Sequence, residues 1–553
     1  MKKYLLLLMC TCVFAACNKS NTPDPAPPPS AFHINSFKIN EQTTGSNSFT
    51  NVAFNPVIKV SFSAPVDHAS VNGGVTFQSP VAGVPYNVSY ANNDSTIVLQ
   101  PTTALLALTK YTLVFSGTLQ SSQKINLSPA FAATIITGID STDKFPQLTD
   151  NQLLDLVQKQ TFTYFWDFGH PVSGMARERN TSGDVVTTGG TGFSVMGIIA
   201  AMNRNFITRG QGLARINTIV NFLKNNCTRY HGAFPHWING TTGITIPFST
   251  KDDGADLVET SYLMQGLLCA RQYFSTADPV ETSLRTNINI LWNGIEWNWF
   301  RQGGQNILYW HWSPNYNFQI NAQIRGWDEA LIVYALAASS NTDSIPRIVY
   351  DNGWAGNGSE KNGGTYFGIQ LPLGPSNGGP LFFAHYSFLG INPHNLTDQY
   401  ADYFAQNVAH SLINYNYCKA NPAGYFGYSY LCWGLTASDD DLHGYAAHEP
   451  NNDDGVISPT AAISSLPYTP TESMNALRFF YFKLGDKIWK QYGFVDAFCL
   501  SRLWYADSFL AIDQGPQIVM IENYRSSLLW NLFMSCPEIK RGMKHIGFQS
   551  PNL

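Results

Sequence analysis

Two kinds of hydrophobic pattern divide the chain. Between residues 32 and 138, short segments such as 57–62 (VIKVSF) and 111–115 (YTLVF) alternate apolar and polar positions or are rich in β-branched residues. Gly, Asn, Asp and Pro separate these segments at short intervals, which is typical of antiparallel strands joined by turns. The pattern predicts a small β-sandwich over residues 32–138.

From about residue 149 the pattern becomes helical, because apolar positions recur every three to four residues. The long helical segments are 153–165, 193–203, 212–226, 256–274, 282–297, 327–339, 400–415, 473–484 and 518–534, and shorter candidates are 344–352, 381–390 and 456–465. Some segments, such as MGIIAAM and ALIVYALAA, are apolar nearly all round, which predicts inner helices covered by outer ones. No short repeat period emerges. We expect a toroid of inner and outer helices, with a plain helical bundle as the alternative.

The N-terminal segment predicts export. Two lysines precede the apolar run of residues 4–16, and Cys17 follows two alanines, so residues 1–16 have the pattern of a signal peptide. The sequence FAAC resembles a bacterial lipobox, in which the cysteine is acylated, whereas a plain secretory peptide is the alternative. Residues 17–31, rich in Pro, Ser and Asn, predict a tether. We therefore expect an exported protein whose membrane contact is a lipid on Cys17.

Composition narrows the functional classes. Of the 553 residues, 44% are hydrophobic, 14% aromatic and 13% charged, with a formal net charge of −5. This composition argues against a disordered protein, and a slightly acidic balance without basic runs argues against a nucleic-acid partner. The cysteines after Cys17 show no CxxC or zinc-type spacing, so no metal or cofactor is expected from Cys227, Cys269, Cys418, Cys432, Cys499 and Cys536.

The first candidate for chemistry is the acidic start of the predicted helix 256–274. Asp256 and Glu259 are three residues apart and share one face of the first turn. Capping of the helix is the alternative explanation, because acidic side chains stabilise helix N-termini. The preceding loop, residues 231–237 (HGAFPHW), combines two histidines and a tryptophan and favours a functional surface.

Two further acidic helix starts are candidates. In the segment GWDEA, Glu329 stands near Trp327, and desolvation beside an indole can keep a carboxyl protonated near neutral pH. Asp513 precedes a Gln-Gly-Pro sequence, for which an Asx turn is the alternative role. Residues 448–455 (HEPNNDDG) imitate fragments of a calcium loop, but the closing Glu is absent and no metal is expected there.

The remaining signal is carboxylates together with aromatic residues. The chain contains no GxSxG, P-loop, HExxH or GxGxxG after a strand. Acidic pairs beside Trp and Tyr favour a glycoside hydrolase, since aromatic faces stack on sugars and carboxyls supply the acid and base. A polysaccharide lyase on a similar toroid and a non-catalytic glycan-binding lipoprotein are the alternatives.

Several long motifs resemble one known family. RYHGAFPHWINGTTG, DDGADLVETSYLMQGLLCARQYF, RGWDEALIVYALAASS, GGPLFFAHYSFLGINP and AIDQGPQIVMIENYRSSLLW are similar to the bacterial glucoamylase-like domain, and within it to glycoside hydrolase family 144, the β-1,2-glucanases. VIKVSFSAPVD and ALTKYTLVFSGTL resemble bacterial Ig-like domains. The resemblance implies a mainly α protein: an (α/α)6 barrel over residues 145–553 preceded by the Ig-like β-sandwich. It also implies hydrolysis of β-1,2-glucan with inversion, to sophorose or short sophoro-oligosaccharides.

The resemblance also implies roles for individual residues. We expect Glu329 as the general acid and Asp513 as the general base, roughly 6.5–9.5 Å apart as inversion requires. Asp256 and Glu259 complete the catalytic set, binding the sugar at the scissile bond or tuning the acid. The expected substrate-binding residues are Asp252, Arg177, His236, Trp237, Trp327, Tyr386, Glu449 and Arg525.

Overall fold

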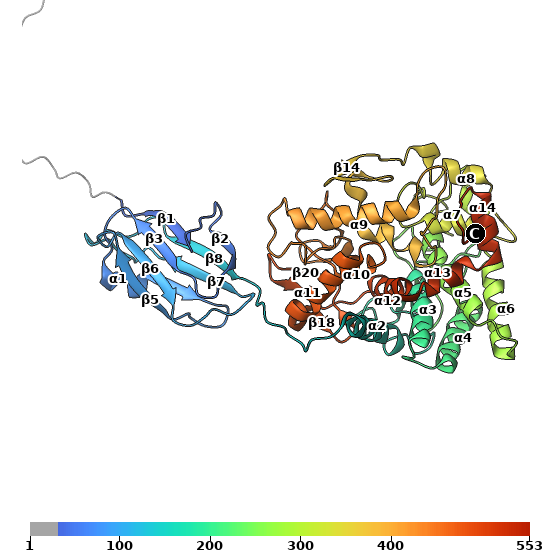
Figure 1. Ribbon diagram of the computed structural model, residues 1–553, viewed down its shortest axis with the longest axis horizontal. Helices are drawn as coiled ribbons and strands as arrows, with labels where there is room; N and C mark the ends of the chain where they lie inside the picture. The colour runs from blue at the N-terminus through green and yellow to red at the C-terminus, as the bar shows by residue number, and fades with distance from the viewer. Residues whose placement is uncertain (1–30) are drawn as a thin grey trace, which may run out of the picture. The chain divides into compact units, whose positions relative to one another are not determined.

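The computed structural model describes residues 31–553, so the predicted signal peptide and Cys17 lie outside the described residues (Figure 1). The chain forms two compact units. Of the described residues, the first unit comprises 31–105 and Lys110–Ile135, and the second Leu106–Thr109 and Ile136–Leu553. None of the helices in residues 31–553 combines the length and hydropathy that crossing a membrane requires.

The first unit is the expected sandwich of two four-stranded sheets (Figure 1). One sheet has the order β1 (Ile34–Ile39), β3 (Ile58–Phe62), β6 (Thr96–Pro101), β5 (Tyr86–Ala91); the other has β2 (Ser48–Val52), β8 (Phe131–Thr137), β7 (Lys110–Phe115), β4 (Val75–Gln78). A short helix, α1 (His68–Gly74), precedes β4. In β3 the buried positions alternate with partly exposed ones, because one face of each sheet packs on the core.

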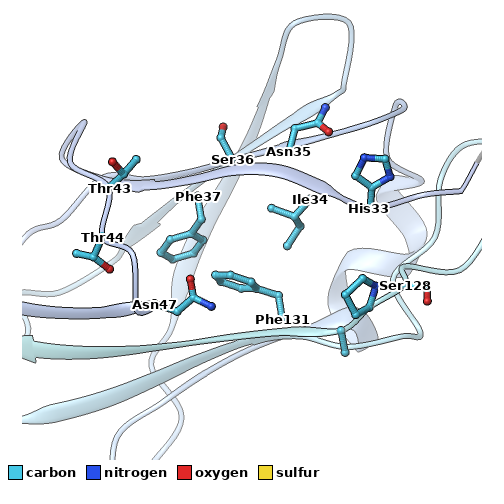
Figure 2. A pocket seen from close by; sticks show the side chains of 12 residues that line it. His33, Ile34, Asn35, Ser36, Phe37, Thr43, Thr44, Asn47, Ser128 and Phe131 are labelled. Atoms are coloured by element: carbon cyan, nitrogen blue, oxygen red, sulfur yellow. The ribbon is translucent and has the colours of Figure 1, made fainter.

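A shallow hollow of about 600 Å³ opens beside β1 in this unit. Figure 2 shows the rings of Phe37 and Phe131 beside one another in its lining, with their centroids 4.9 Å apart, and Thr43, Thr44 and Asn47 at one side. None of its lining residues is acidic, so it offers no carboxyl pair for acid–base chemistry. The chemistry expected from the sequence has to lie in the second unit.

The second unit is built of helices joined by long loops (Figure 1). The helices are α2 (Asp150–Trp166), α3 (Thr188–Asn203), α4 (Arg209–Asn225), α5 (Leu257–Tyr273), α6 (Pro279–Asn293), α7 (Leu331–Ser339), α8 (Arg347–Asn352), α9 (Tyr403–Ala420), α10 (Pro459–Ser464), α11 (Pro470–Ile488), α12 (Ala511–Ser526), α13 (Leu528–Met534) and α14 (Pro537–His545). Short strands line the loops: β9 (Val185–Thr187), β10 (Trp237–Asn239), β11 (Thr245–Ile246), β12 (Ala255–Asp256), β13 (His311–Trp312), β14 (Thr365–Tyr366), β15 (Ile369–Gln370), β16 (Ala437–Asp440), β17 (Gly444–Ala447), β18 (Trp489–Lys490), β19 (Gly493–Phe494), β20 (Phe498–Cys499) and β21 (Trp504–Tyr505).

Inner and outer helices alternate along the chain, as the expected barrel requires. Helices α3, α5, α7, α10 and most of α12 are buried on every side, whereas α2, α4, α6 and α11 bury only one face. The inner position between α8 and α9 is taken by two 3₁₀ turns, Leu381–Ala384 and Ser387–Leu389. Helix α3 packs against α5 and α12, while α12 also packs against α10 and α5 against α7. The inner helices therefore form the wall around one core.

Three helix predictions differ from the structure. Segment 518–534 is two helices, because Ser527 adopts a left-handed conformation (φ 57°) between α12 and α13. Segment 381–390 forms the two 3₁₀ turns instead of an α-helix. Helix α12 begins at Ala511 and runs through Pro516, so Asp513 lies in its first turn and forms no separate Asx turn. The third difference places Asp513 at the start of an inner helix.

Candidate active site

The segments leading into the inner helices meet at one end of the barrel. The backbone N–H of Gly189 and the hydroxyl of Thr187, at the start of α3, donate to the carboxylate of Glu259 in the first turn of α5. The N–H of Ala511, which opens α12, donates to the carbonyl oxygen of Glu178, shortly before β9. Acidic residues that open these helices therefore collect at this end, where the helix dipoles also favour negative charge.

Asp256 has a structural and a site role at once. It is the N-cap of α5: its Oδ1 accepts from the backbone N–H groups of Val258 (3.0 Å) and Glu259 (2.9 Å). Its Oδ2 lies 3.0 Å from Nδ1 of His236. Burial acts to raise the pKa of Asp256, but the hydrogen bond from His236 and the charge of His311 outweigh it, so that pKa is lowered. Asp256 is therefore the ionised centre of this group.

His311 joins Asp252 to the same group. Strand β13 pairs with β12 so that His311 stands opposite Asp256. Nε2 of His311 lies 3.3 Å from Oδ2 of Asp252 and 3.7 Å from Oδ2 of Asp256. Burial and then the charge of Asp256 raise the pKa of Asp252 to about 7. Burial would lower the pKa of His236, yet Glu259 and Asp256 raise it to about 9, so His236 is cationic at neutral pH.

Glu329 lies in the loop that enters α7 and faces this group. Burial first, and then the negative charges of Asp256 and Glu259, raise its pKa to about 7. Burial also raises the pKa of Glu259, against the hydrogen bonds from Gly189 and Thr187. A carboxyl with a pKa near neutrality can hold a proton and still release it, as a general acid requires.

A second carboxylate group surrounds Asp513. Burial and then the charge of Asp496 raise the pKa of Asp513 well above its usual value. Burial and then the charge of Asp439 raise that of Asp496 to about 7. Two carboxyls that repel each other in this way titrate as a pair, which retains one proton over a wide pH range. Asp439, by contrast, is paired with Arg179, whose Nη1 lies 3.2 Å from its Oδ1.

One tyrosine and one hollow connect the two groups. After burial, Asp513 is the largest cause of the raised pKa of Tyr386, and Glu329 also contributes, so this buried phenol lies near both carboxyls. A hollow of about 340 Å³ is lined by His236 from the first group and Arg179 from the second. Its other lining residues are Glu178, Thr187, Trp237, Phe248, Tyr445, Leu510 and Ile512. The hollow is therefore bordered by one member of each group, by the carboxylate of Glu178 and by the aromatic side chains of Trp237, Phe248 and Tyr445, while Glu329 and Asp513 lie near Tyr386 and are not among its lining residues.

Two of the expected substrate-binding residues lie away from this space. Trp327 is buried and its Nε1 donates to Nδ1 of His410 at 3.3 Å, so its indole belongs to the core. Arg525 is in the last turn of α12, twelve residues after Asp513, or roughly 18 Å along the helix axis. Its Nη1 donates to Oδ1 of Asp155 at 2.6 Å. For both residues the structure shows structural contacts in place of a substrate surface.

Arg177 and Glu449 are also not among the residues that line the hollow. The guanidinium of Arg177 stacks on the ring of Phe168 at 4.5 Å, and Arg179, two residues later, lines the hollow instead. Glu449 pairs through its backbone with Asn452, beyond β17. Expected residues that the structure does bring together are Asp252, Asp256, Glu259, Glu329, Asp513, His236, Trp237 and Tyr386.

Sequence reasoning missed part of the second carboxylate group. Asp439 and Asp496 follow loop segments with no helix start, no neighbouring histidine and no recurrent spacing. Arg179 stands in an unremarkable loop, RERN, before β9. His311 did carry a signal, since it stands between Trp310 and Trp312 in a loop. Its pairing with Asp256 depends on the β12–β13 register.

In the described part of the chain, two groups of side chains bring enough ligand atoms together to hold a metal ion. The first is His236, Asp252 and Asp256, within this site. There the imidazole of His236 already pairs with Asp256, and that hydrogen bond accounts for their proximity. The second group is outside the site and is described below.

Comparisons with known proteins agree with this architecture. A family model described as "Putative glucoamylase" matches residues 321–537, and a bacterial Ig-like domain model matches residues 38–135. The endo-β-1,2-glucanase of Chitinophaga pinensis, solved with sophorotriose and glucose, is 50% identical. The match covers 74% of this chain and 100% of that chain, with a TM-score of 0.72.

Two proteins of Parabacteroides distasonis are also similar. A β-1,2-glucanase structure is 36% identical, covering 94% of this chain and 73% of that chain with a TM-score of 0.71. An exo β-1,2-glucooligosaccharide sophorohydrolase acting at the non-reducing end is 46% identical over 422 residues, 72% of this chain. The match spans 58% of that curated relative's length. These findings confirm the resemblance that the motifs indicated.

Proposed function

Because this chain belongs to the bacterial glucoamylase-like family that includes these β-1,2-glucan hydrolases, we propose that it hydrolyses β-1,2-glucan by an inverting acid–base mechanism. The observation that carries the proposal is the arrangement of Glu329, with its pKa near 7, and the Asp496–Asp513 pair, both near Tyr386. Inversion requires an acid and a base on opposite faces of the sugar.

In this mechanism Glu329 gives its proton to the glycosidic oxygen as the bond to the anomeric carbon breaks. Water attacks that carbon from the opposite face, and its proton passes to the ionised member of the Asp496–Asp513 pair, directly or through a substrate hydroxyl. His236 and Asp256 hold their charges beside the acid. The negative charges of Asp256 and Glu259 keep Glu329 protonated until the leaving oxygen needs a proton.

Products and location are part of the proposal. We expect sophorose or short sophoro-oligosaccharides, since the named relatives include both an exo-acting sophorohydrolase and an endo-acting glucanase. The lipobox-like sequence around Cys17 supports an exported enzyme anchored to the cell envelope by lipid, with the polymer as its partner. Palmitate labelling of the expressed chain, lost in Cys17→Ala, tests the anchor.

The activity is tested on linear β-1,2-glucan with the full chain. Sophorose as the sole early product indicates exo action, and mixed oligomers indicate endo action. The anomer released first, followed by NMR, has to be the α form if cleavage inverts. A double bond in the product, detected by ultraviolet absorbance, would indicate a lyase, and no product at all would contradict an enzymatic function.

A further inference from the structure

Two consecutive aspartates on β16 point in opposite directions, as neighbouring residues of a strand do. Asp439 faces the catalytic end of the barrel, where it pairs with Arg179. Asp440, the last residue of β16, faces the loop that follows β17, where Nε2 of His448 lies 3.4 Å from its Oδ2. The hairpin β16–β17 therefore carries one carboxylate toward the cleft and one away from it.

The second carboxylate belongs to a compact group of three side chains. One ligand atom each from Asp440, His448 and Asp454 lies within 4.8 Å of the other two. His448 is fully buried and Asp440 is 4% exposed, whereas Asp454 is partly exposed. Asp454 is thus the member of the group that reaches solvent.

The buried members of this group have polar atoms without hydrogen-bond partners. Oδ1 of Asp440 accepts from the backbone N–H groups of Leu442 and His443, whereas Oδ2, although it lies 3.4 Å from Nε2 of His448, accepts no hydrogen bond from the described residues. Neither ring nitrogen of His448 forms a hydrogen bond with any of residues 31–553. Leaving such groups unpaired in the interior costs about 1–3 kcal/mol each, so a further partner is expected.

The surrounding charges point to a cation as that partner. Arg502 lies nearby, but its guanidinium forms a two-pronged pair with the carboxylate of Asp441. His443, which is exposed, approaches Asp454 at 3.2 Å from outside. The imidazole of His448, with a ring nitrogen close to both carboxylates, can offer a lone pair to such a cation. Two carboxylates and a neutral imidazole are a donor set for a metal ion.

We propose that Asp440, His448 and Asp454 bind a divalent metal ion of the zinc type, with water as the remaining ligand. One imidazole nitrogen and two carboxylate oxygens suit a tetrahedral Zn²⁺ site, whereas Ca²⁺ prefers six to eight oxygens. The ion ties the hairpin β16–β17 to the loop after it. That hairpin also carries Asp439 and Tyr445 at the catalytic end. Asp440, His448 and Asp454 have no part in the proposed hydrolysis, so the metal site is a structural one and does not depend on that proposal.

The experiment titrates the chelator-treated full chain with Zn²⁺, and separately with Mn²⁺ and Ca²⁺, by calorimetry and thermal unfolding. We expect about one equivalent of Zn²⁺ beyond any bound at other histidines, a raised unfolding temperature, and weaker binding of Ca²⁺. His448→Gln and Asp440→Asn are expected to weaken this binding at least about 10–100-fold.

Matched variants separate this site from its neighbours. His443→Gln changes an exposed histidine beside Asp454, and His236→Gln removes the imidazole of the other candidate group; both are expected to keep the equivalent of Zn²⁺. If His448→Gln does not fold, Asp454→Asn tests the partly exposed ligand. Failure of the chain to bind Zn²⁺ or Mn²⁺, selectivity for Ca²⁺, or binding unchanged in both His448→Gln and Asp454→Asn would overturn the proposal.

Discussion

Nδ1 of His236 lies 3.0 Å from Oδ2 of Asp256, whose other oxygen caps helix α5. The carboxylate is therefore held in place by the backbone before any substrate binds. The imidazole in turn is held by a carboxylate that cannot move without uncapping the helix. This relationship joins local helix chemistry to the electrostatics of the candidate active site.

The His236–Asp256 pair predicts a dependence of stability on pH. The pKa of His236 is about 9 in the folded chain and about 6.5 in an unfolded one. A raised histidine pKa contributes stability that is fully present below about pH 6.5 and is lost as the pH rises through about 9. The stability difference between wild type and His236→Gln should shrink by roughly 2–3 kcal/mol across this range, measured by urea unfolding. A difference that stays constant with pH would contradict the raised pKa.

Glu329→Gln should lower kcat by about 10²–10⁴-fold, because glutamine cannot protonate the leaving oxygen. In the wild type, kcat/KM should fall as the pH rises through about 7, where Glu329 loses its proton. The variant should lose this alkaline limb. Asp328→Asn is the matched control, because the carboxyl of Asp328 accepts a hydrogen bond from the backbone N–H of Ala330. This variant should keep the alkaline limb of kcat/KM. A Glu329→Gln variant that retains most of its rate would show that Glu329 is not the general acid.

Asp496→Asn should shift the acidic limb of kcat/KM to lower pH. Its carboxylate raises the pKa of Asp513, so its removal lets Asp513 ionise at lower pH. Asp513→Asn should instead lower kcat by about 10²-fold or more, because asparagine cannot accept the proton of the attacking water. Parallel pH–rate profiles of the two variants check this. Equal profiles for wild type and Asp496→Asn would show that the two carboxyls are not coupled.

Gly189→Ala should disturb both stability and activity. A Cβ there would lie 2.8 Å from Oε2 of Glu259 and 2.8 Å from the ring of Tyr262. We expect a loss of about 1–3 kcal/mol in the free energy of unfolding and a reduced kcat. Gly197→Ala on the same helix is the control, because its Cβ meets Ile518 only at 3.6 Å. That variant should keep its activity and gain up to about 1 kcal/mol from helix propensity.

Arg525→Ala should leave kcat and KM within about twofold of wild type. Its guanidinium binds Asp155 and Gln158 at the far end of α12, so the expected effect is a stability loss of about 1 kcal/mol. Steady-state kinetics and thermal unfolding measure the two effects separately. A large rise in KM would show instead that Arg525 binds the substrate.

Local patterns were sufficient for much of the architecture. The helical period located the inner helices α3, α5 and α7 because burial on every side leaves an apolar run that few other elements show. Asp256 and Glu259 could be placed together because three residues are one turn of a helix. The end of α12 could not be located, since the break at Ser527 is a backbone conformation that its residue type does not announce.

The sequence by itself determined most of the helical segments, the apolar inner helices α3, α5 and α7, and the acidic residues at the start of α5, because these are properties of neighbours along the chain. Only the tertiary structure decided that Asp439 and Asp496 join Asp513, and that Trp327 turns into the core to meet His410. The physical reason is that charge interactions and burial depend on distances through space. Closing the ring of helices sets those distances between residues that the sequence holds far apart.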